Sequence, residues 1–122
     1  MDKRENKKKG NWGELKAAEF LRSQGYYIRE MQWKSLRFEI DIIAEKDNDI
    51  LFVEVKTRFS DAYGDPWEAV NMSKRKKICT SADQYIRTHH CDREPRFDII
   101  SVLHTDGTTK ITHLKGAFYP ML

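Results

Sequence analysis

Two acidic residues and one lysine stand in the most apolar part of the chain. Asp41 lies in the segment Phe38-Glu39-Ile40-Asp41-Ile42-Ile43-Ala44, and Glu54 and Lys56 lie in the segment Leu51-Phe52-Val53-Glu54-Val55-Lys56. Strands this apolar are usually covered on both faces, and an unpaired carboxylate is costly to bury. Carboxylates at these positions therefore indicate that a cation binds them.

Carboxylates from two adjacent strands make a hard, anionic, all-oxygen site. Mg²⁺ suits such a site, because it binds through one or two protein carboxylates, keeps several waters and takes phosphate oxygens from a substrate. The ion can lower the pKa of a water and neutralise phosphate charge. A lysine two residues after a metal-binding glutamate shares its strand face and can hold the attacking water or donate to the transition state. Asp41, Glu54 and Lys56 supply this set, with Mn²⁺ as the expected substitute ion.

Spacing alone leaves a second interpretation open for the Glu-x-Lys pair. Glutamate and lysine two positions apart on a strand are common as an exposed cross-strand ion pair. Glu39 and Asp41 on the matching face of the neighbouring strand favour the metal site over that pair.

The residue pattern predicts an α/β (α+β) fold in the order α-β-β-β-α-β-β. Asp47-Asn48-Asp49 is a turn between the two acidic strands, which form a β-hairpin. Asn11 is a candidate N-cap and Gly25 a candidate C′ residue of the first helix, and a strand over 26–33 follows it. A second helix is expected over 71–88 and two strands over 96–103 and 110–114, joined by an Asp-Gly turn. Three sequential strands predict an antiparallel meander, and the strand-helix-strand unit a parallel crossover.

Glu14 lies on or beside the apolar stripe of the first predicted helix. The stripe consists of Trp12, Leu15, Ala18 and Leu21, widened by Ala17 and Phe20. Glu14 precedes Ala18 by four positions, so it can face the sheet. The alternative is a first-turn glutamate that favours the helix dipole, and spacing does not separate the two.

Cationic and aromatic residues cluster after the acidic hairpin. The loop over 58–67 carries Arg58, Phe59, Tyr63 and Trp67, which suit a surface that holds a sugar-phosphate chain; alternatively, the aromatics only pin the loop. Lys74 precedes Ile78 by four positions and can point inward from the start of the second helix, where positive charge is mildly unfavourable. The other lysines there are read as a solvated face. The basic residues 1–10 are expected to be a flexible arm, either a solubilising tail or a phosphate contact.

Composition excludes several classes of protein. A chain of 122 residues suits one domain, here expected over 11–122. No apolar run approaches the length of a membrane span, and no apolar region follows the basic N-terminus as in a secretory signal. Cys79 and Cys91 form neither a disulfide framework nor a zinc pattern, so a reducing cytoplasm is expected. The contiguous His89-His90-Cys91-Asp92 is poorly spaced for chelation. A net charge of +3 permits an anionic partner without requiring one.

These residues together resemble a known pattern. Asp41 followed by Glu54-Val55-Lys56 resembles the PD-(D/E)xK nuclease signature, and the element order resembles the restriction-endonuclease-like αβββαβ core, a central mixed sheet flanked by helices. More closely, the chain resembles the YraN-like family, whose members are expected to be endonucleases related to archaeal-type Holliday junction resolvases. The motifs that carry this resemblance are Gly13-Glu14 with Ala18 and Leu21, Gly25-Tyr26, 39–44, 52–58, Tyr63-Gly64, Lys74 and Arg96-Phe97-Asp98.

The resemblance implies a role for each matching residue. Asp41 and Glu54 would be metal ligands, with the Val55 carbonyl as a third, and Lys56 the catalytic lysine. Glu14 matches a first-helix glutamate that resolvase-like nucleases place beside the metal. Glu39 belongs to the Glu-x-Asp pair without a clear role. One departure is Phe38, where the family usually carries glycine.

Three hypotheses follow. The first is a Mg²⁺-dependent DNA endonuclease, with selectivity for branched DNA as an additional expectation. An enzyme that cuts two strands symmetrically would need to be a homodimer. The second is a catalytically silent nucleic-acid-binding module with a nuclease-like fold, which predicts salt-sensitive DNA binding without turnover. The third is a structural role, in which the acids form an ion-pair lattice on the strand surface.

Overall fold

The structure, a computed structural model, describes residues 3–36, 38–60 and 70–119. Its elements follow the predicted order, and the strands form one mixed sheet in the order β1-β2-β3-β4-β5. The β3–β4 pair is parallel and the other pairs are antiparallel, as the meander and the crossover predicted. The elements are α1 (Lys3–Ser23), β1 (Tyr27–Lys34), β2 (Glu39–Lys46), β3 (Asp49–Arg58), α2 (Met72–His89), β4 (Glu94–Thr105) and β5 (Thr108–Phe118).

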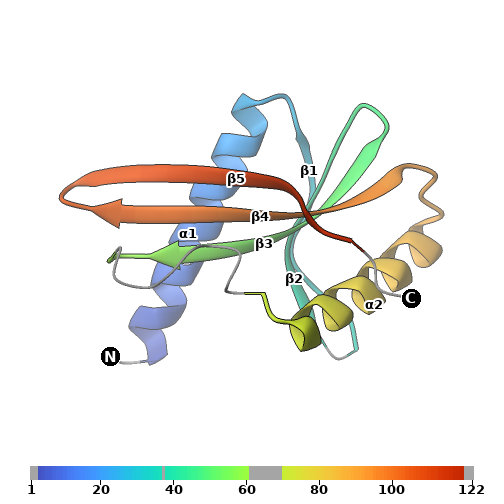
Figure 1. The fold of residues 1–122 in the computed structure, drawn as a ribbon, viewed down its shortest axis with the longest axis horizontal. Helices are drawn as coiled ribbons and strands as arrows, with labels where there is room; N and C mark the ends of the chain where they lie inside the picture. The colour runs from blue at the N-terminus through green and yellow to red at the C-terminus, as the bar shows by residue number, and fades with distance from the viewer. Residues whose placement is uncertain (1–2, 37, 61–69, 120–122) are drawn as a thin grey trace.

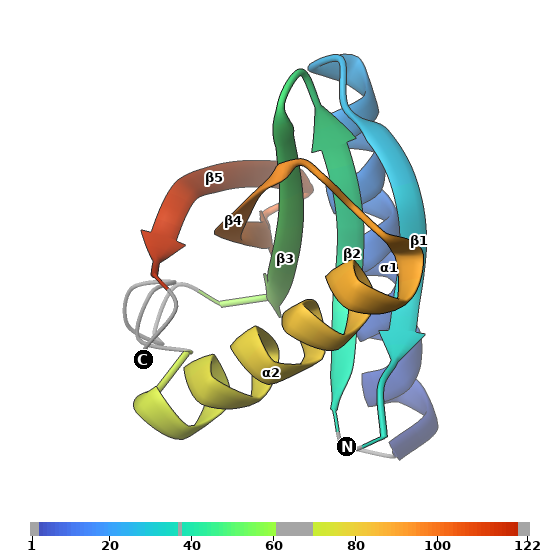
Figure 2. The same ribbon diagram turned by 90° about the vertical axis from the view of Figure 1, so that its right-hand side faces the viewer.

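The two helices cover opposite faces of this sheet (Figures 1 and 2). The core under α1 contains Ala17, Ala18 and Leu21 of the helix, packed on strand residues that include Leu51 and Val53. The core under α2 contains Ile78, Ala82 and Tyr85, packed on strand residues that include Phe52. Successive β3 residues therefore enter different cores, which explains why this strand is almost wholly apolar. The predicted α+β fold, with a mixed sheet flanked by helices, is confirmed.

Short-range signals place the ends of the elements. Asn71 caps α2, and its side chain accepts a hydrogen bond from the Lys74 backbone N–H (2.9 Å). His90 ends the helix in the left-handed conformation, at φ 51°. The Asp106-Gly107 turn has φ values of 52° and 75°, as a tight hairpin of this type requires.

The predicted start of the first helix is wrong. Helix α1 begins at Lys3 rather than after Asn11, so residues 3–10, expected to belong to a flexible arm, are helical. Lysine, arginine and glutamate are good helix formers, and Asn11 continues the helix instead of capping it. Leu15, predicted to face the core, is 58% exposed, because the stripe that contacts the sheet runs through Gly13, Ala17, Ala18 and Leu21.

Strict alternation of side chains along β2 fails at one position. Alternation would place Ile40 on the same face as Ile42, but Ile40 packs with Ile43 in the core under α2, while Ile42 lies under α1. The β2–β3 pairing ends at Ile42 and Val53. Just beyond that pair, the Val55 N–H donates to Asp41 Oδ2 (2.8 Å). The Asp41 carboxyl thus accepts a hydrogen bond from a β3 backbone N–H at the point where the two strands separate.

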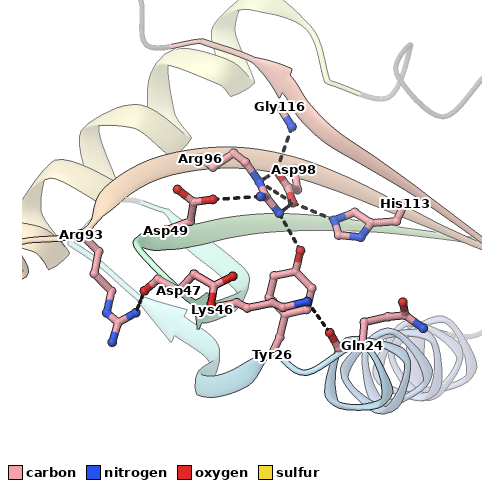
Figure 3. Close-up of polar contacts among 10 residues, drawn as sticks. All are labelled: Gln24, Tyr26, Lys46, Asp47, Asp49, Arg93, Arg96, Asp98, His113 and Gly116. Atoms are coloured by element: carbon pink, nitrogen blue, oxygen red, sulfur yellow. Dashed lines mark hydrogen bonds and ion pairs between the residues drawn. The ribbon is translucent and has the colours of Figure 1, made fainter.

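A buried ionic cluster joins the other end of the sheet (Figure 3). Asp98 is fully buried and accepts hydrogen bonds from Arg96 (2.9 Å), His113 (2.7 Å) and the Gly116 N–H (3.0 Å). Arg96 also donates to the Tyr26 hydroxyl (3.0 Å) and pairs with Asp49. The cluster links β3, β4 and β5 to the residue that precedes β1, so Asp98 has a structural explanation.

Candidate metal centre

Asp41 and Glu54 lie on adjacent strands at the end of the β2–β3 ladder. In the register that pairs Ile42 with Val53, they are the next pair of positions. Asp41 is partly buried and its carboxyl reaches the backbone of Val55. Glu54 is only 9% exposed, on the face of β3 that α2 covers. The structure therefore brings together the two carboxylates that the sequence singled out.

Helix α1 adds Glu14 to this pair. The helix lies very close to β3 at Gly13, where an added Cβ would come within 1.8 Å of Thr57 Oγ1, so only glycine fits without a shift. The next residue, Glu14, is half-buried, and its carboxyl hydrogen-bonds to that of Asp41. Of the two open interpretations of Glu14, the structure supports the one in which it faces the sheet.

Gln32 holds Glu14 in place from β1. Its side-chain amide donates to Glu14 Oε2 (2.7 Å) and to Asn11 Oδ1 (2.6 Å). Its backbone has φ 53°, a left-handed conformation inside a strand. The sequence analysis missed this residue, because neither strand periodicity nor spacing indicates a left-handed residue at this position.

Burial raises the pKa of two of these carboxyl groups, Asp41 and Glu14. Burial raises the pKa of Asp41 to about 8, helped by the Glu54 charge and opposed by the Val55 N–H. Burial also raises the pKa of Glu14, while its hydrogen bonds to Gln32 and Asp41 oppose the rise. A nearby cation would favour the charged form of Asp41 and so offset this shift.

Lys74 supplies one positive charge to this group. Its ammonium pairs with Glu54 Oε1 from the first turn of α2, and the Lys74 side chain is 35% exposed. The prediction that Lys74 points inward is confirmed. Lys56 follows two residues after Glu54 and is exposed.

A groove of about 650 Å³ lies between α1, β3 and the start of α2. Glu14 and Glu54 lie in its wall together with cations from three elements. The lining residues are Lys9, Gly10, Glu14, Glu54, Val55, Lys56, Thr57, Arg58, Phe59, Ser60 and Lys74. The groove therefore combines two carboxylates with four cationic side chains among uncharged residues, which suits a phosphate held against a metal ion.

The donor set fits a hard divalent cation. Asp41 and Glu54 offer carboxylate oxygens from neighbouring strands, and Val55 belongs to the groove lining. Within the described ranges, no three His, Cys, Asp or Glu side chains are already arranged as a metal-binding group. Mg²⁺ does not need such a cage, because it binds through one or two carboxylates and fills its remaining positions with water and phosphate oxygens.

Two of the other predicted residues, Arg58 and Phe59, line the groove. Arg58 lines the groove and donates to Ser101 Oγ at 3.4 Å. Phe59 packs beside Trp12 and His104, with Lys9 over its ring, so it does pin the chain to α1 and β4. Tyr63, Gly64 and Trp67 lie outside the described residues.

Residues near the predicted site have local roles too. Glu39 is half-buried, and its charge helps to raise the pKa of Glu14, after burial. Phe38, the departure from the family pattern, packs against the core under α2. In the segment His89-His90-Cys91-Asp92, His89 stacks on Tyr85 and His90 caps the helix.

Comparisons with known proteins agree on one family. Residues 13–102 match the model described as "Uncharacterised protein family UPF0102". A UPF0102 protein from Bacteroides thetaiotaomicron is 42% identical over 118 residues, which is 97% of this chain and 98% of that protein. UPF0102 proteins from Syntrophomonas wolfei (42%, 93% of this chain, 99% of that protein) and Porphyromonas gingivalis (44%, 93% and 85%) are similar as well.

The matched region contains Glu14, Asp41, Glu54, Lys56 and Lys74, so the whole candidate centre lies inside it. In the described part of the chain, no helix is long and apolar enough to cross a bilayer. By its family match and by relatives that align over almost its full length, the chain belongs to the UPF0102 family.

Proposed function

We propose that this protein is a Mg²⁺-dependent DNA endonuclease that hydrolyses phosphodiester bonds, with Mn²⁺ as a substitute ion. The observation that carries the proposal is the convergence of Asp41, Glu54 and Glu14 beside a groove whose other lining residues include Lys56, Arg58 and Lys74. The Glu54 charge raises the pKa of Asp41, after burial, and a bound cation would offset this repulsion.

Each residue has a chemical task in this proposal. Asp41 and Glu54 would hold the ion, assisted by the Val55 carbonyl, and the bound ion would lower the pKa of a water and offset phosphate charge. Lys56, exposed on the groove side of β3, would orient the attacking water or donate to the developing oxyanion. Glu14, fixed by Gln32, would position Asp41 through their shared hydrogen bond.

Cations along the groove would bind the DNA backbone. Arg58 and Lys74 line it from β3 and α2, and phosphate contacts of this kind position a duplex without reading its sequence. We propose branched DNA as the preferred substrate and a homodimer as the form that cuts two strands. Cys79 and Cys91 are not joined in a disulfide, which suits a reducing cytoplasm as its location.

A panel of DNA structures tests the proposal. Labelled duplex, nicked, flapped and four-way DNA would be incubated with the parent protein and with Glu54→Gln, in Mn²⁺ and in EDTA. We expect cleavage only by the parent with metal, strongest on branched DNA. Glu54→Gln keeps the volume of the side chain, and its folding would be checked by circular dichroism.

Two outcomes would reject the nuclease. One is that every DNA stays intact, and the other is that Glu54→Gln cuts as well as the parent. Salt-sensitive binding of uncut DNA would favour the binding module. If the protein neither binds nor cuts any of these DNAs, the remaining explanation is a structural role of the acids.

A further inference from the structure

One ion pair at the candidate centre joins two residues to which the proposed function gives separate tasks. The Lys74 ammonium is paired with Glu54 Oε1, an oxygen of one of the two carboxylates that would hold the metal ion. Glu54 is almost buried, with a side chain that is 10% exposed, so a charge left without a partner there would be costly. Lys74 therefore neutralises the charge of Glu54.

The position of Lys74 is set by the fold. It lies in the first turn of α2, and its backbone N–H is held by the Asn71 cap at 2.9 Å. That turn contains no acidic residue, and the positive end of the helix dipole disfavours an ammonium there. The pairing with Glu54 offsets this penalty. Because Lys74 is 35% exposed and lines the groove, its flexible stem can leave Glu54 without unfolding the helix.

We infer that Lys74 is an internal competitor of the metal ion. In the DNA-free protein, the ammonium and a divalent cation compete for Glu54, since like charges cannot share one carboxylate without repulsion. When a divalent cation is bound, Lys74 is released into the groove, where it can pair with a phosphate. This inference rests on the proposed metal site. It adds a coupling between the binding of the metal ion and the binding of a DNA phosphate.

The coupling acts in both directions. A phosphate that pairs with Lys74 removes the competitor from Glu54 and so tightens metal binding, and a bound cation frees Lys74 for the phosphate. The protein would therefore bind metal weakly until DNA lies in the groove. A lysine whose only task is to contact DNA would give no such effect on metal affinity in the absence of DNA.

Metal affinity without DNA tests the inference. Calorimetric titration of Mn²⁺ would compare the parent with Lys74→Met, which keeps the unbranched stem and removes the charge. We expect Lys74→Met to bind Mn²⁺ about tenfold more tightly, within the usual range for two ligands that are coupled. Lys74→Arg keeps the charge and should bind as weakly as the parent. Lys77→Met is the control, because Lys77 is exposed on the same helix.

Thermal unfolding gives a second readout. In EDTA, Lys74→Met should melt below the parent, since Glu54 loses its counter-ion, and Mn²⁺ should raise its melting temperature more than that of the parent. Equal or weaker Mn²⁺ binding by Lys74→Met would overturn the inference. If the parent binds Mn²⁺ and cuts DNA while Lys74→Met binds Mn²⁺ no more tightly, the proposed function stands and only the competition between Lys74 and the metal ion is rejected. A parent that binds no Mn²⁺ would reject the proposed metal site itself.

Discussion

Two buried aspartates of this protein have opposite surroundings. Asp98 receives hydrogen bonds from His113, Arg96 and the Gly116 N–H, and although burial opposes the shift, these donors lower its pKa. Asp41 shares a hydrogen bond with Glu14 and lies near the Glu54 charge, so its pKa is raised to about 8. The donors around Asp98 favour its charged form, whereas burial and the Glu54 charge disfavour the charged form of Asp41.

At the residue scale, Asp41→Asn should stabilise the metal-free protein. The folded pKa of Asp41 is raised from 3.8 to about 8, so its contribution to stability is present at pH 4 and is lost as the pH rises toward 8. The variant should therefore gain over the parent between pH 5 and 8, by roughly 1–2 kcal/mol at pH 8. Urea denaturation in EDTA at both pH values measures the gain, and an equal difference at pH 5 and pH 8 would contradict it.

Asp98→Asn should act in the opposite direction. The amide would leave Arg96 and His113 without their anionic partner, at a cost of about 3 kcal/mol. Because the folded pKa of Asp98 is lowered, its contribution is fully present above the unfolded value of about 4 and is lost only as the pH falls through the lowered folded pKa. Urea denaturation from pH 7 downward should show a difference from the parent that is still large at pH 4 and shrinks at lower pH. A difference that has already vanished at pH 4 would argue against this account of Asp98.

At the element scale, Gly13 sets how closely α1 approaches β3. Gly13→Ala would place a Cβ 1.8 Å from Thr57 Oγ1, so the helix must shift. We expect a loss of about 1–3 kcal/mol, measured by thermal unfolding, together with weaker Mn²⁺ binding because Glu14 moves with the helix. Gly10→Ala on the same helix is the matched control. It meets nothing within 4 Å and should be neutral or stabilising by up to about 1 kcal/mol. Equal effects of the two substitutions would refute the close-approach argument.

The element order was predictable because each element has a strong local signal. Apolar periodicity, Asn71 and the Asp106-Gly107 turn locate α2 and the last hairpin to within a few residues. The start of α1 was not predictable, because residues 3–10 lack an apolar stripe and their helicity comes from propensity alone. The placement of Ile40 was missed because strand alternation assumes an unbroken ladder.

At the scale of the whole molecule, the candidate centre is assembled from α1, β2, β3 and the start of α2. Asp41, Glu54 and Lys56 could be singled out from the sequence, since acids in apolar strands are conspicuous. The contacts of Gln32 with Glu14 and of Lys74 with Glu54 could not, because they join residues 18 positions apart in one case and different elements in both. They depend on how the two helices pack on opposite faces of the sheet (Figure 2).

The most direct test of the account is calorimetric titration of Mn²⁺ into the parent, Asp41→Asn and Glu54→Gln at pH 7.5, without DNA. The account predicts saturable Mn²⁺ binding by the parent and a loss of that binding in each variant, because the two carboxylates share one ion. Undiminished binding in both variants, or none in the parent, would contradict it.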